Sequence, residues 1–211
     1  MRHPTDVRRR LLDAARQLFA RDGYEGASVR DITRRARANL GAVTYHFGSK
    51  EALYHAVFAE FAEPFKRHVA AAVEDGGSAL DRIEAIVRAF FHHIESHPEM
   101  PPLLLRQLSS GRPVPPPMAE AMRYNVALIV GTIAAGQREG TIRAGEPLLL
   151  ALGVISQPVY LAVAAPVIKR VAGVDTKSPE LRERVIETVA ATVRAGLAGP
   201  GAPPPRTRRS A

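Results

Sequence analysis

The sequence predicts an all-α protein: an N-terminal three-helix helix-turn-helix domain followed by a larger helical domain, about nine helices in total. Apolar residues recur every three or four positions in almost every segment, as expected of helices with one buried face. No segment shows the alternation of apolar and polar residues that a half-buried strand would have. A chain of 211 residues can bury one large core or two small ones.

The charge of the chain is concentrated at its two ends. Residues 1–50 carry a net charge of +6, residues 51–205 a net charge of −1, and residues 206–211 a net charge of +3. A basic head on a nearly neutral body is typical of nucleic-acid-binding modules, although basic termini that only maintain solubility give the same pattern. The chain has no cysteine, which excludes disulfides, thiolate zinc sites and a cysteine nucleophile, and is consistent with a reducing cytoplasm.

The first 50 residues are predicted to form three short helices. The first runs over residues 5–21 and ends before a glycine. Ser28 and Asp31 have the spacing of a capping box at the start of the second. Asn39 is expected to cap the third helix, which ends near Phe47.

Six more helices are predicted after these three. Ser49 is expected to cap the fourth, in which Pro64 removes a backbone hydrogen bond and so predicts a kink or the end of the helix. The expected ranges of the other five are 79–96, 103–108, 118–139, 147–171 and 178–197. We therefore expect a helix-turn-helix domain, a connecting helix, a larger helical domain and a disordered basic tail, over residues 1–50, 51–76, 77–198 and 199–211 respectively.

The expected helix over 147–171 has an unusual composition, since no charged residue occurs between Leu148 and Ile168. This stretch is long enough to span a bilayer, but it contains Pro158 and Pro166, and the chain has no second such stretch. A helix that is apolar all round also fits a protein interior or a subunit interface, which we expect here rather than a membrane. Each proline frees one backbone carbonyl, which either lines a cavity or only allows the helix to bend.

Residues 39–47 have the composition of a helix that enters the major groove of DNA. Gly41 and Ala42 allow the backbone to approach a duplex closely, and Leu40 suits contact with a thymine methyl group. Val43 is expected to face the core. Hydrogen-bonding side chains are supplied by Asn39, Thr44 and Tyr45.

At these residues the chain resembles the DNA-binding domain of TetR-family repressors. The runs that carry the resemblance are LLDAARQLF at 11–19, GY at 23–24, SVRDI at 28–32 and YHFGSKEAL at 45–53. It is specific over residues 7–60 and vague beyond them. The resemblance therefore implies a fold and a DNA-binding role for residues 7–60, and implies less about the rest of the chain.

The resemblance implies a role for each matched residue. Ser28 and Arg30 would contact a phosphate and could also reach a base, and Tyr45 and His46 would reach the DNA backbone as well as the groove. Lys50 would pair with a phosphate, because the N-terminus of a helix and an ammonium both favour an anion. The implied DNA-binding residues are Ser28, Arg30, Arg37, Asn39, Leu40, Gly41, Ala42, Thr44, Tyr45, His46 and Lys50.

Two positions depart from the family pattern. The turn before the third helix usually has glycine where Arg37 stands, so we expect a slightly different turn, in which Arg37 can add a phosphate contact. Val43 and Thr44 replace a common Leu-Tyr pair, which reduces the surface that reads the bases and leaves the base preference open.

The resemblance also implies a homodimer and a ligand. TetR-like proteins pair through two C-terminal helices, here 147–171 and 178–197, and such a dimer would bind a palindromic operator on double-stranded DNA. A small-molecule effector, largely apolar, would bind among the central helices. The candidate ligand-binding residues are Phe90, His93, Leu104, Gln107, Met122, Asn125, Gln157 and Tyr160.

Catalytic and metal-binding functions have little support in the sequence. No catalytic triad order, phosphate-binding loop or pair of carboxylates suited to catalysis is present, so we expect no catalytic residue and no cofactor. His93 and His97 lie four residues apart on one helical face, as metal ligands can, but beyond Glu95 or Glu99 no carboxylate pattern completes a metal shell. We therefore expect His92, His93 and His97 to be solvated histidines without a metal. The sequence thus predicts a cytoplasmic, ligand-responsive, sequence-specific regulator of the repressor type. A TetR-like activator and a nonspecific architectural DNA-binding protein are the alternatives.

Overall fold

The computed structural model describes residues 4–74 and 76–204, and nine helices account for most of these residues. One isolated bridge between Ile142 and Ala198 is the only β-type pairing within these two ranges. The prediction of an all-α fold is therefore confirmed. The helices pack as two compact units, one formed by the chain up to Pro64 together with His97–Ala121, the other by the remainder.

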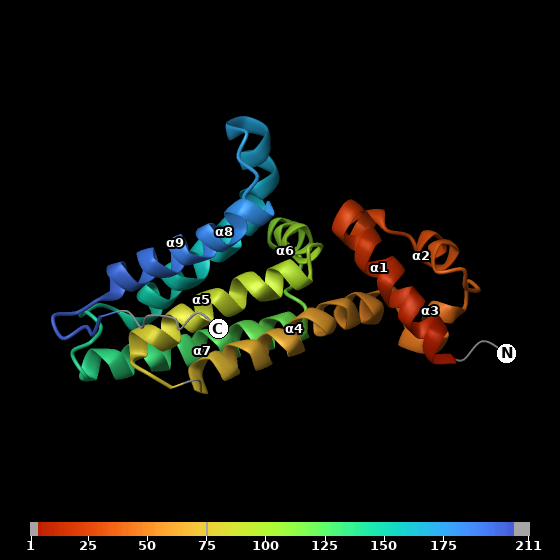
Figure 1. The fold of residues 1–211 in the computed structure, drawn as a ribbon. Helices are drawn as coiled ribbons and strands as arrows, with labels where there is room; N and C mark the ends of the chain where they lie inside the picture. The colour runs from red at the N-terminus through yellow and green to blue at the C-terminus, as the bar shows by residue number, and fades with distance from the viewer. Residues whose placement is uncertain (1–3, 75, 205–211) are drawn as a thin grey trace. The chain divides into compact units, whose positions relative to one another are not determined.

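The first unit combines the predicted head with a helix from the middle of the chain. Its helices are α1 (Pro4–Gly26), α2 (Val29–Arg35), α3 (Ala42–Phe47), the first part of α4 (Lys50–Glu74) and α6 (Met100–Ser109) (Figure 1). Phe19, Ile32 and Leu53 are fully buried in its core, and Leu103 of α6 and Met118 belong to the same core. This compact unit therefore extends beyond the expected domain of residues 1–50.

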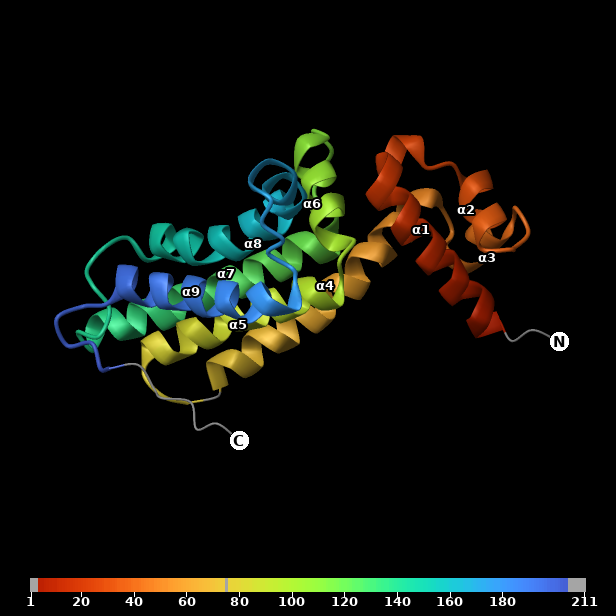
Figure 2. The ribbon, with the colours of Figure 1, turned by 45° about the horizontal axis from the view of Figure 1, so that its top comes forward.

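The second unit is a helical bundle. Its helices are α5 (Ala79–Ser96), most of α7 (Pro116–Arg138), α8 (Pro147–Ala172), α9 (Pro179–Leu197) and the second part of α4 (Figure 2). α5 packs against both α8 and α9, and its apolar side chains, Ile83 and Val87 among them, are fully buried. Gly136 allows α7 to approach α5 closely, because a Cβ atom there would lie only 2.7 Å from that of Ala79.

The start signals of the first helices are partly confirmed. The Ser28 and Ser49 hydroxyls each accept a backbone N–H from the first turn of the following helix, both at 3.0 Å. The prediction that Asn39 caps the third helix is wrong, because α3 begins only at Ala42 and has Gly41 at its N-cap position without a side-chain cap. The Asn39 carbonyl instead accepts the N–H of Ala42 at 2.9 Å, which forms a turn before the helix.

Two expected helix ends differ from the structure. Pro64 does not end α4, which continues to Glu74, since a proline removes only one hydrogen bond from a helix that packing supports on both sides of it. α1 extends to Gly26, but Gly23 within it has the non-helical angles φ 76° and ψ 179°. The expected break at this glycine is therefore present, and one further turn follows it.

The segment after α9 is ordered as far as the structure describes it, so the prediction of a disordered tail is wrong for residues 199–204. Two of its backbone N–H groups donate to carbonyls of the turn between α7 and α8, at 2.9 and 3.1 Å. The Arg194 guanidinium donates to the carbonyls of Pro203 and Pro204, at 2.8 and 3.3 Å. The remainder of the predicted tail, residues 205–211, lies outside the described residues.

The apolar helix α8 is continuous through both of its prolines. Among the described helices it is the one that is long and apolar enough to cross a membrane, a test that core helices of soluble proteins also pass. Only 22% of its most apolar stretch is buried within the single chain. An apolar surface of this extent marks a site where another surface packs.

Candidate DNA-binding face

α2 and α3 are joined by a turn that begins with a Schellman motif. The Ala38 N–H donates to the Thr33 carbonyl at 2.9 Å, and the Arg37 N–H donates to the Arg34 carbonyl at 3.2 Å. Arg37 has a φ of 52° and is the one non-glycine residue with a positive φ in the described ranges. Arg37 thus adopts the left-handed backbone conformation that a glycine adopts easily.

We expect Arg37→Gly to raise the free energy of unfolding by about 0.5–1 kcal/mol. The left-handed conformation costs an L-residue about 1–2 kcal/mol, and the larger entropy of glycine in the unfolded chain offsets about half of that gain. Urea unfolding measures the change. Arg30→Gly, which places the same residue inside α2, is the matched control and should lower the stability by about 1 kcal/mol. Equal losses in the two variants would show that Arg37 is not strained.

The surface of α3 divides into a buried side and an exposed side. Val43 is 1% exposed and packs with Ile32, as predicted for the core. On the other side Tyr45 is 83% exposed, and its ring lies edge-on to the His46 ring with 4.9 Å between centroids. Leu40, in the turn before α3, is 57% exposed. α3 and the turn before it therefore present an aromatic and an apolar side chain to solvent, while Val43 anchors the helix in the core.

Most of the predicted DNA-binding residues are accessible on this face. Those that are exposed are Ser28, Arg30, Arg37, Asn39, Leu40, Gly41, Thr44 and Tyr45. Those that are half-buried are Ala42, His46 and Lys50. α2, the turn and α3 thus bring together residues that are spread over the sequence from 28 to 46.

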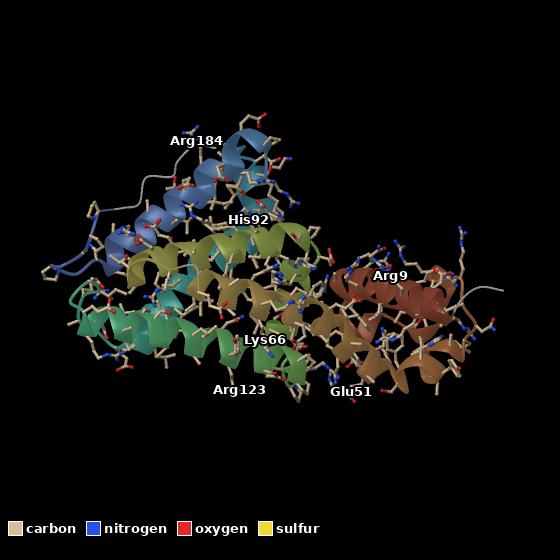
Figure 3. The ribbon with its side chains drawn as sticks, turned by 60° about the horizontal axis from the view of Figure 1, so that its bottom comes forward. Arg9, Glu51, Lys66, His92, Arg123 and Arg184 are labelled. Carbon is tan, nitrogen blue, oxygen red and sulfur yellow. The ribbon has the colours of Figure 1, made fainter. Side chains whose placement is uncertain are left out.

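A shallow open groove of about 510 Å³ runs between α3 and the start of α1. It is lined by Val7, Arg10, Arg37, Ala38, Asn39, Gly41, Ala42, Tyr45 and His46. Arg10 donates to the Ala36 carbonyl at 2.9 Å and pairs with Asp6. The contribution of α1 to this face was not predicted from the sequence. The basic run that includes Arg9, which is exposed on α1 (Figure 3), was a signal for it.

The Ser28 side chain forms the N-cap of α2. Its hydroxyl accepts the Asp31 N–H and donates to the Asp31 carboxylate at 2.5 Å. This hydrogen bond, together with the charge of Arg34, holds the pKa of Asp31 below its usual range. A phosphate contact by the Ser28 hydroxyl would therefore compete with the cap.

Lys50 begins α4, and its ammonium lies over an aromatic ring. Its Nζ is 4.3 Å from the centroid of the Tyr24 ring, and the Arg112 guanidinium carbon is 3.9 Å from the same centroid. Burial lowers the pKa of Lys50, the Glu25 carboxylate opposes this shift, and the Arg112 charge adds to it. Arg112 was not predicted, because it lies some sixty residues after Lys50 and only tertiary packing brings the two together.

In the second unit, two of the predicted ligand-binding residues, Phe90 and His93, contact the same ring. Phe65 of α4, which was not predicted, has its ring 4.6 Å from that of Phe90 and stacks on the imidazole of His93 at 4.7 Å. Phe90, His93 and Asn125 are all buried. The Asn125 Oδ1 accepts no hydrogen bond from the described part of the chain. Gln157 is half-buried on α8.

The other predicted ligand-binding residues lie elsewhere. Met122 and Tyr160 are exposed, by 48% and 67%. Leu104 and Gln107 belong to the first unit. The Gln107 Oε1 accepts the Tyr54 hydroxyl at 2.9 Å, and its Nε2 donates to two carbonyls of the loop after α6, each at 3.1 Å. The Gln107 amide therefore connects α4 to that loop.

The histidine cluster of α5 is split between surface and interior. His92 is exposed and has its Nδ1 3.7 Å from Glu95, a carboxylate that also pairs with Arg182 at 3.3 Å. His93 is fully buried, so the expectation of solvated histidines is wrong for this residue. No group of three or more His, Asp or Glu side chains in the described residues could hold a metal ion.

Comparison with known families identifies the chain. Residues 11–57 match the family described as "Bacterial regulatory proteins, tetR family". Residues 80–193, more than half of the chain, match the "Tetracyclin repressor-like, C-terminal domain". The chain belongs to the TetR family. The second match extends the relationship into the region where the sequence motifs were vague.

Relatives within the TetR family agree with this assignment. The HTH-type transcriptional repressor AcnR of Corynebacterium glutamicum is 44% identical over 57 residues, which cover 27% of this chain and 30% of AcnR. The aligned part thus spans less than a third of that curated relative. A tetR-family regulatory protein from Rhodococcus RHA1 has a TM-score of 0.75 at 20% identity, covering 92% of this chain and 97% of that one. AibR, solved in complex with isovaleryl coenzyme A and operator DNA, has a TM-score of 0.69 at 17% identity, covering 88% and 97%. The structural likenesses show the TetR fold over nearly the whole chain.

Proposed function

We propose that this TetR-family chain is a cytoplasmic, ligand-responsive, sequence-specific DNA-binding regulator of the repressor type, without a catalytic role. The observation that carries the proposal is the exposed side of α3, where Thr44 and Tyr45 face solvent while Val43 is buried. A short helix with exposed polar and small residues fits the major groove, and the basic residues around it attract phosphates.

A homodimer through α8 and α9 is the second part of the proposal. α8 carries a series of large apolar side chains that are between 45% and 80% exposed in the single chain. They are Leu148, Leu149, Leu152, Tyr160, Val167 and Val171. Packing against the same helices of a second copy would remove this surface from water and would present two α3 helices to the two halves of a palindrome.

The proposed effector is a largely apolar small molecule bound in the second unit. The buried rings of Phe90 and His93 pack against the half-buried ring of Phe65, and Asn125 supplies a buried amide oxygen to which a ligand could donate a hydrogen bond. AibR was solved with a coenzyme A thioester and operator DNA, and it shares this fold. A ligand weakens DNA binding only if it binds more tightly to the state that does not bind DNA. A hundredfold loss of DNA affinity needs a difference of about 2.7 kcal/mol between the free energies of ligand binding to the two states.

The test is selection of duplexes from random DNA by the full chain, followed by competition binding and light scattering. We expect a dimer that binds one palindrome roughly a thousandfold or more tighter than random duplex at physiological salt. Equal affinity for all duplexes would establish an architectural protein instead, and a strict monomer would contradict the dimer. Transcription from a promoter that carries the selected operator then distinguishes a repressor from an activator.

Removal of residues 205–211 is expected to lower DNA affinity modestly and to flatten its dependence on salt. These residues include three arginines, and each phosphate contact that they make adds about one unit to the salt slope. The deletion leaves Pro203 and Pro204, with their hydrogen bonds from Arg194, in place. Binding isotherms at several salt concentrations measure the slope. An unchanged slope would show that these arginines do not contact DNA.

A further inference from the structure

Four side chains from three parts of the chain meet beside the N-terminus of α4. Tyr24 and Glu25 come from the end of α1, Lys50 is the first residue of α4, and Arg112 lies between α6 and α7. The Lys50 ammonium and the Arg112 guanidinium both lie on the Tyr24 ring. The Arg112 Nη1 also forms an ion pair with the Glu25 Oε1 at 2.7 Å. The Glu25 carboxylate is therefore paired with Arg112, and Lys50 lies on the same Tyr24 ring as that guanidinium.

The backbone of Arg112 is fixed by hydrogen bonds that lead back to α4. Its carbonyl accepts the Gln107 Nε2 at 3.1 Å, and its N–H donates to the Ser110 Oγ at 3.2 Å. The Tyr54 hydroxyl, one turn after Lys50 on α4, donates to the Gln107 Oε1 at 2.9 Å. Burial raises the pKa of Tyr54, so the hydroxyl stays protonated and remains a donor. This chain of contacts holds the guanidinium beside Glu25 instead of leaving it in solvent.

The ion pair with Arg112 determines what Lys50 can do. The Glu25 side chain is 79% exposed, and its charge acts to raise the pKa of Lys50. Without Arg112, this carboxylate would be free to pair with Lys50, on which it already acts electrostatically. A Lys50–Glu25 pair would neutralise the lysine, and a carboxylate not neutralised by Arg112 would repel a phosphate that approaches the start of α4.

We propose that Arg112 is a positioning residue for DNA binding, which pairs with Glu25 and so leaves Lys50 on Tyr24 available to a DNA phosphate. The inference rests on the proposed function, since Lys50 is the residue there assigned to a phosphate. It makes the loop after α6 part of the DNA-binding head, although this loop follows the helix-turn-helix by some sixty residues. The role of Arg112 is indirect: it acts through Glu25 and does not itself contact DNA.

Binding to the selected operator tests the proposal with four variants. Arg112→Gln should bind about tenfold more weakly, with a smaller salt slope, because Glu25 then neutralises Lys50. Glu25→Gln should bind at least as tightly as the wild type. The double variant Arg112→Gln/Glu25→Gln should return to within about twofold of the wild type, and Arg112→Lys, which keeps the charge, should recover part of the affinity. A double variant as weak as Arg112→Gln would mean that Arg112 contacts DNA itself or only supports the fold, and would overturn the proposal.

A titration without DNA gives a second and independent readout. The chain has four lysines, so ¹³Cε NMR signals can be assigned through Lys50→Arg and followed with pH. Arg112→Gln should raise the pKa of Lys50, because a repelling charge is lost and Glu25 becomes its partner, and adding Glu25→Gln should lower it again. Arg106→Gln is the matched control, since Arg106 donates to the carbonyls of α1 at Ala20 and Arg21, and should leave the pKa of Lys50 unchanged.

The two readouts separate the inference from the proposed function. An unchanged pKa of Lys50 in Arg112→Gln would overturn the inference, whatever the DNA measurements show. A wild-type protein that prefers no duplex would overturn the proposed function, while the titration would still report whether Arg112 keeps Glu25 away from Lys50.

Discussion

Tyr45→Ala is expected to weaken operator binding roughly 30-fold or more while leaving the dimer and its thermal unfolding nearly unchanged. Tyr45 is the most exposed large side chain of α3, so its removal costs little packing. Each subunit of a dimer would lose a DNA contact that contributes about 1–3 kcal/mol to binding. The two losses add in the binding free energy. Competition binding to the selected operator and to random duplex measures the effect.

The control for this experiment is the same substitution at another exposed tyrosine. Tyr124 of α7 is 40% exposed and belongs to the other compact unit. Tyr124→Ala should leave operator affinity within about twofold of the wild type, because surface substitutions away from a binding face have small effects. If Tyr45→Ala binds as well as Tyr124→Ala, the assignment of the exposed side of α3 to DNA is wrong.

Arg194→Met is expected to lower the free energy of unfolding by about 2–4 kcal/mol. The Arg194 guanidinium, 7% exposed, donates to Asp81 at 2.9 Å and to Glu84 at 2.7 Å, and it also holds the carbonyls after α9. Methionine keeps the volume but leaves two poorly exposed carboxylates without their main cation. Urea unfolding at neutral pH measures the loss. Arg184→Met on the same helix, at an exposed position labelled in Figure 3, should change the stability by less than about 0.5 kcal/mol.

The loss in Arg194→Met should also depend on pH in a definite direction. Burial acts to raise the pKa of Asp81, but the Ser78 N–H and the Arg194 guanidinium outweigh it and hold this pKa below the usual range. A group with a lowered folded pKa stabilises the fold above its ordinary pKa and loses this contribution as the pH falls through the folded value. The difference between wild type and variant should therefore shrink below about pH 4. A difference that stays constant down to pH 2 would show that the Arg194–Asp81 pair does not contribute.

The helices near the N-terminus could be predicted because their signals are local. The Ser28 cap depends on hydrogen bonds between residues three apart, and the buried Val43 follows from helical periodicity. The Asn39 cap was predicted by the same reasoning and is wrong. The turn after the left-handed Arg37 continues through Gly41, so α3 begins later than the best capping residue. Capping preferences indicate which residues could begin a helix, and the backbone path of the preceding turn determines which of them does.

The predicted ligand-binding residues show a different limit. Each lies on one of the central helices and has an apolar or polar side chain that suits a small-molecule site, but this does not tell which neighbour contacts that side chain. Gln107 faces Tyr54, in the unit that contains the helix-turn-helix. His93 stacks on Phe65, which was not among the predicted ligand-binding residues. The chemistry of a side chain was readable in the sequence, but its partner was not.

The amino-acid sequence alone determined that this protein is all-helical, that its head carries a helix-turn-helix, and which side of the third helix faces solvent. These properties depend on residues within a few positions of one another. Tertiary structure alone decided that Arg112 meets Glu25 and Lys50, that Arg194 holds the segment after α9, and that α6 packs with the head. Such contacts join residues that are close only after the chain has folded. In the sequence, many other residues of the same charge or hydropathy could equally be the partner of each of these side chains. Shape and packing then determine which pair forms.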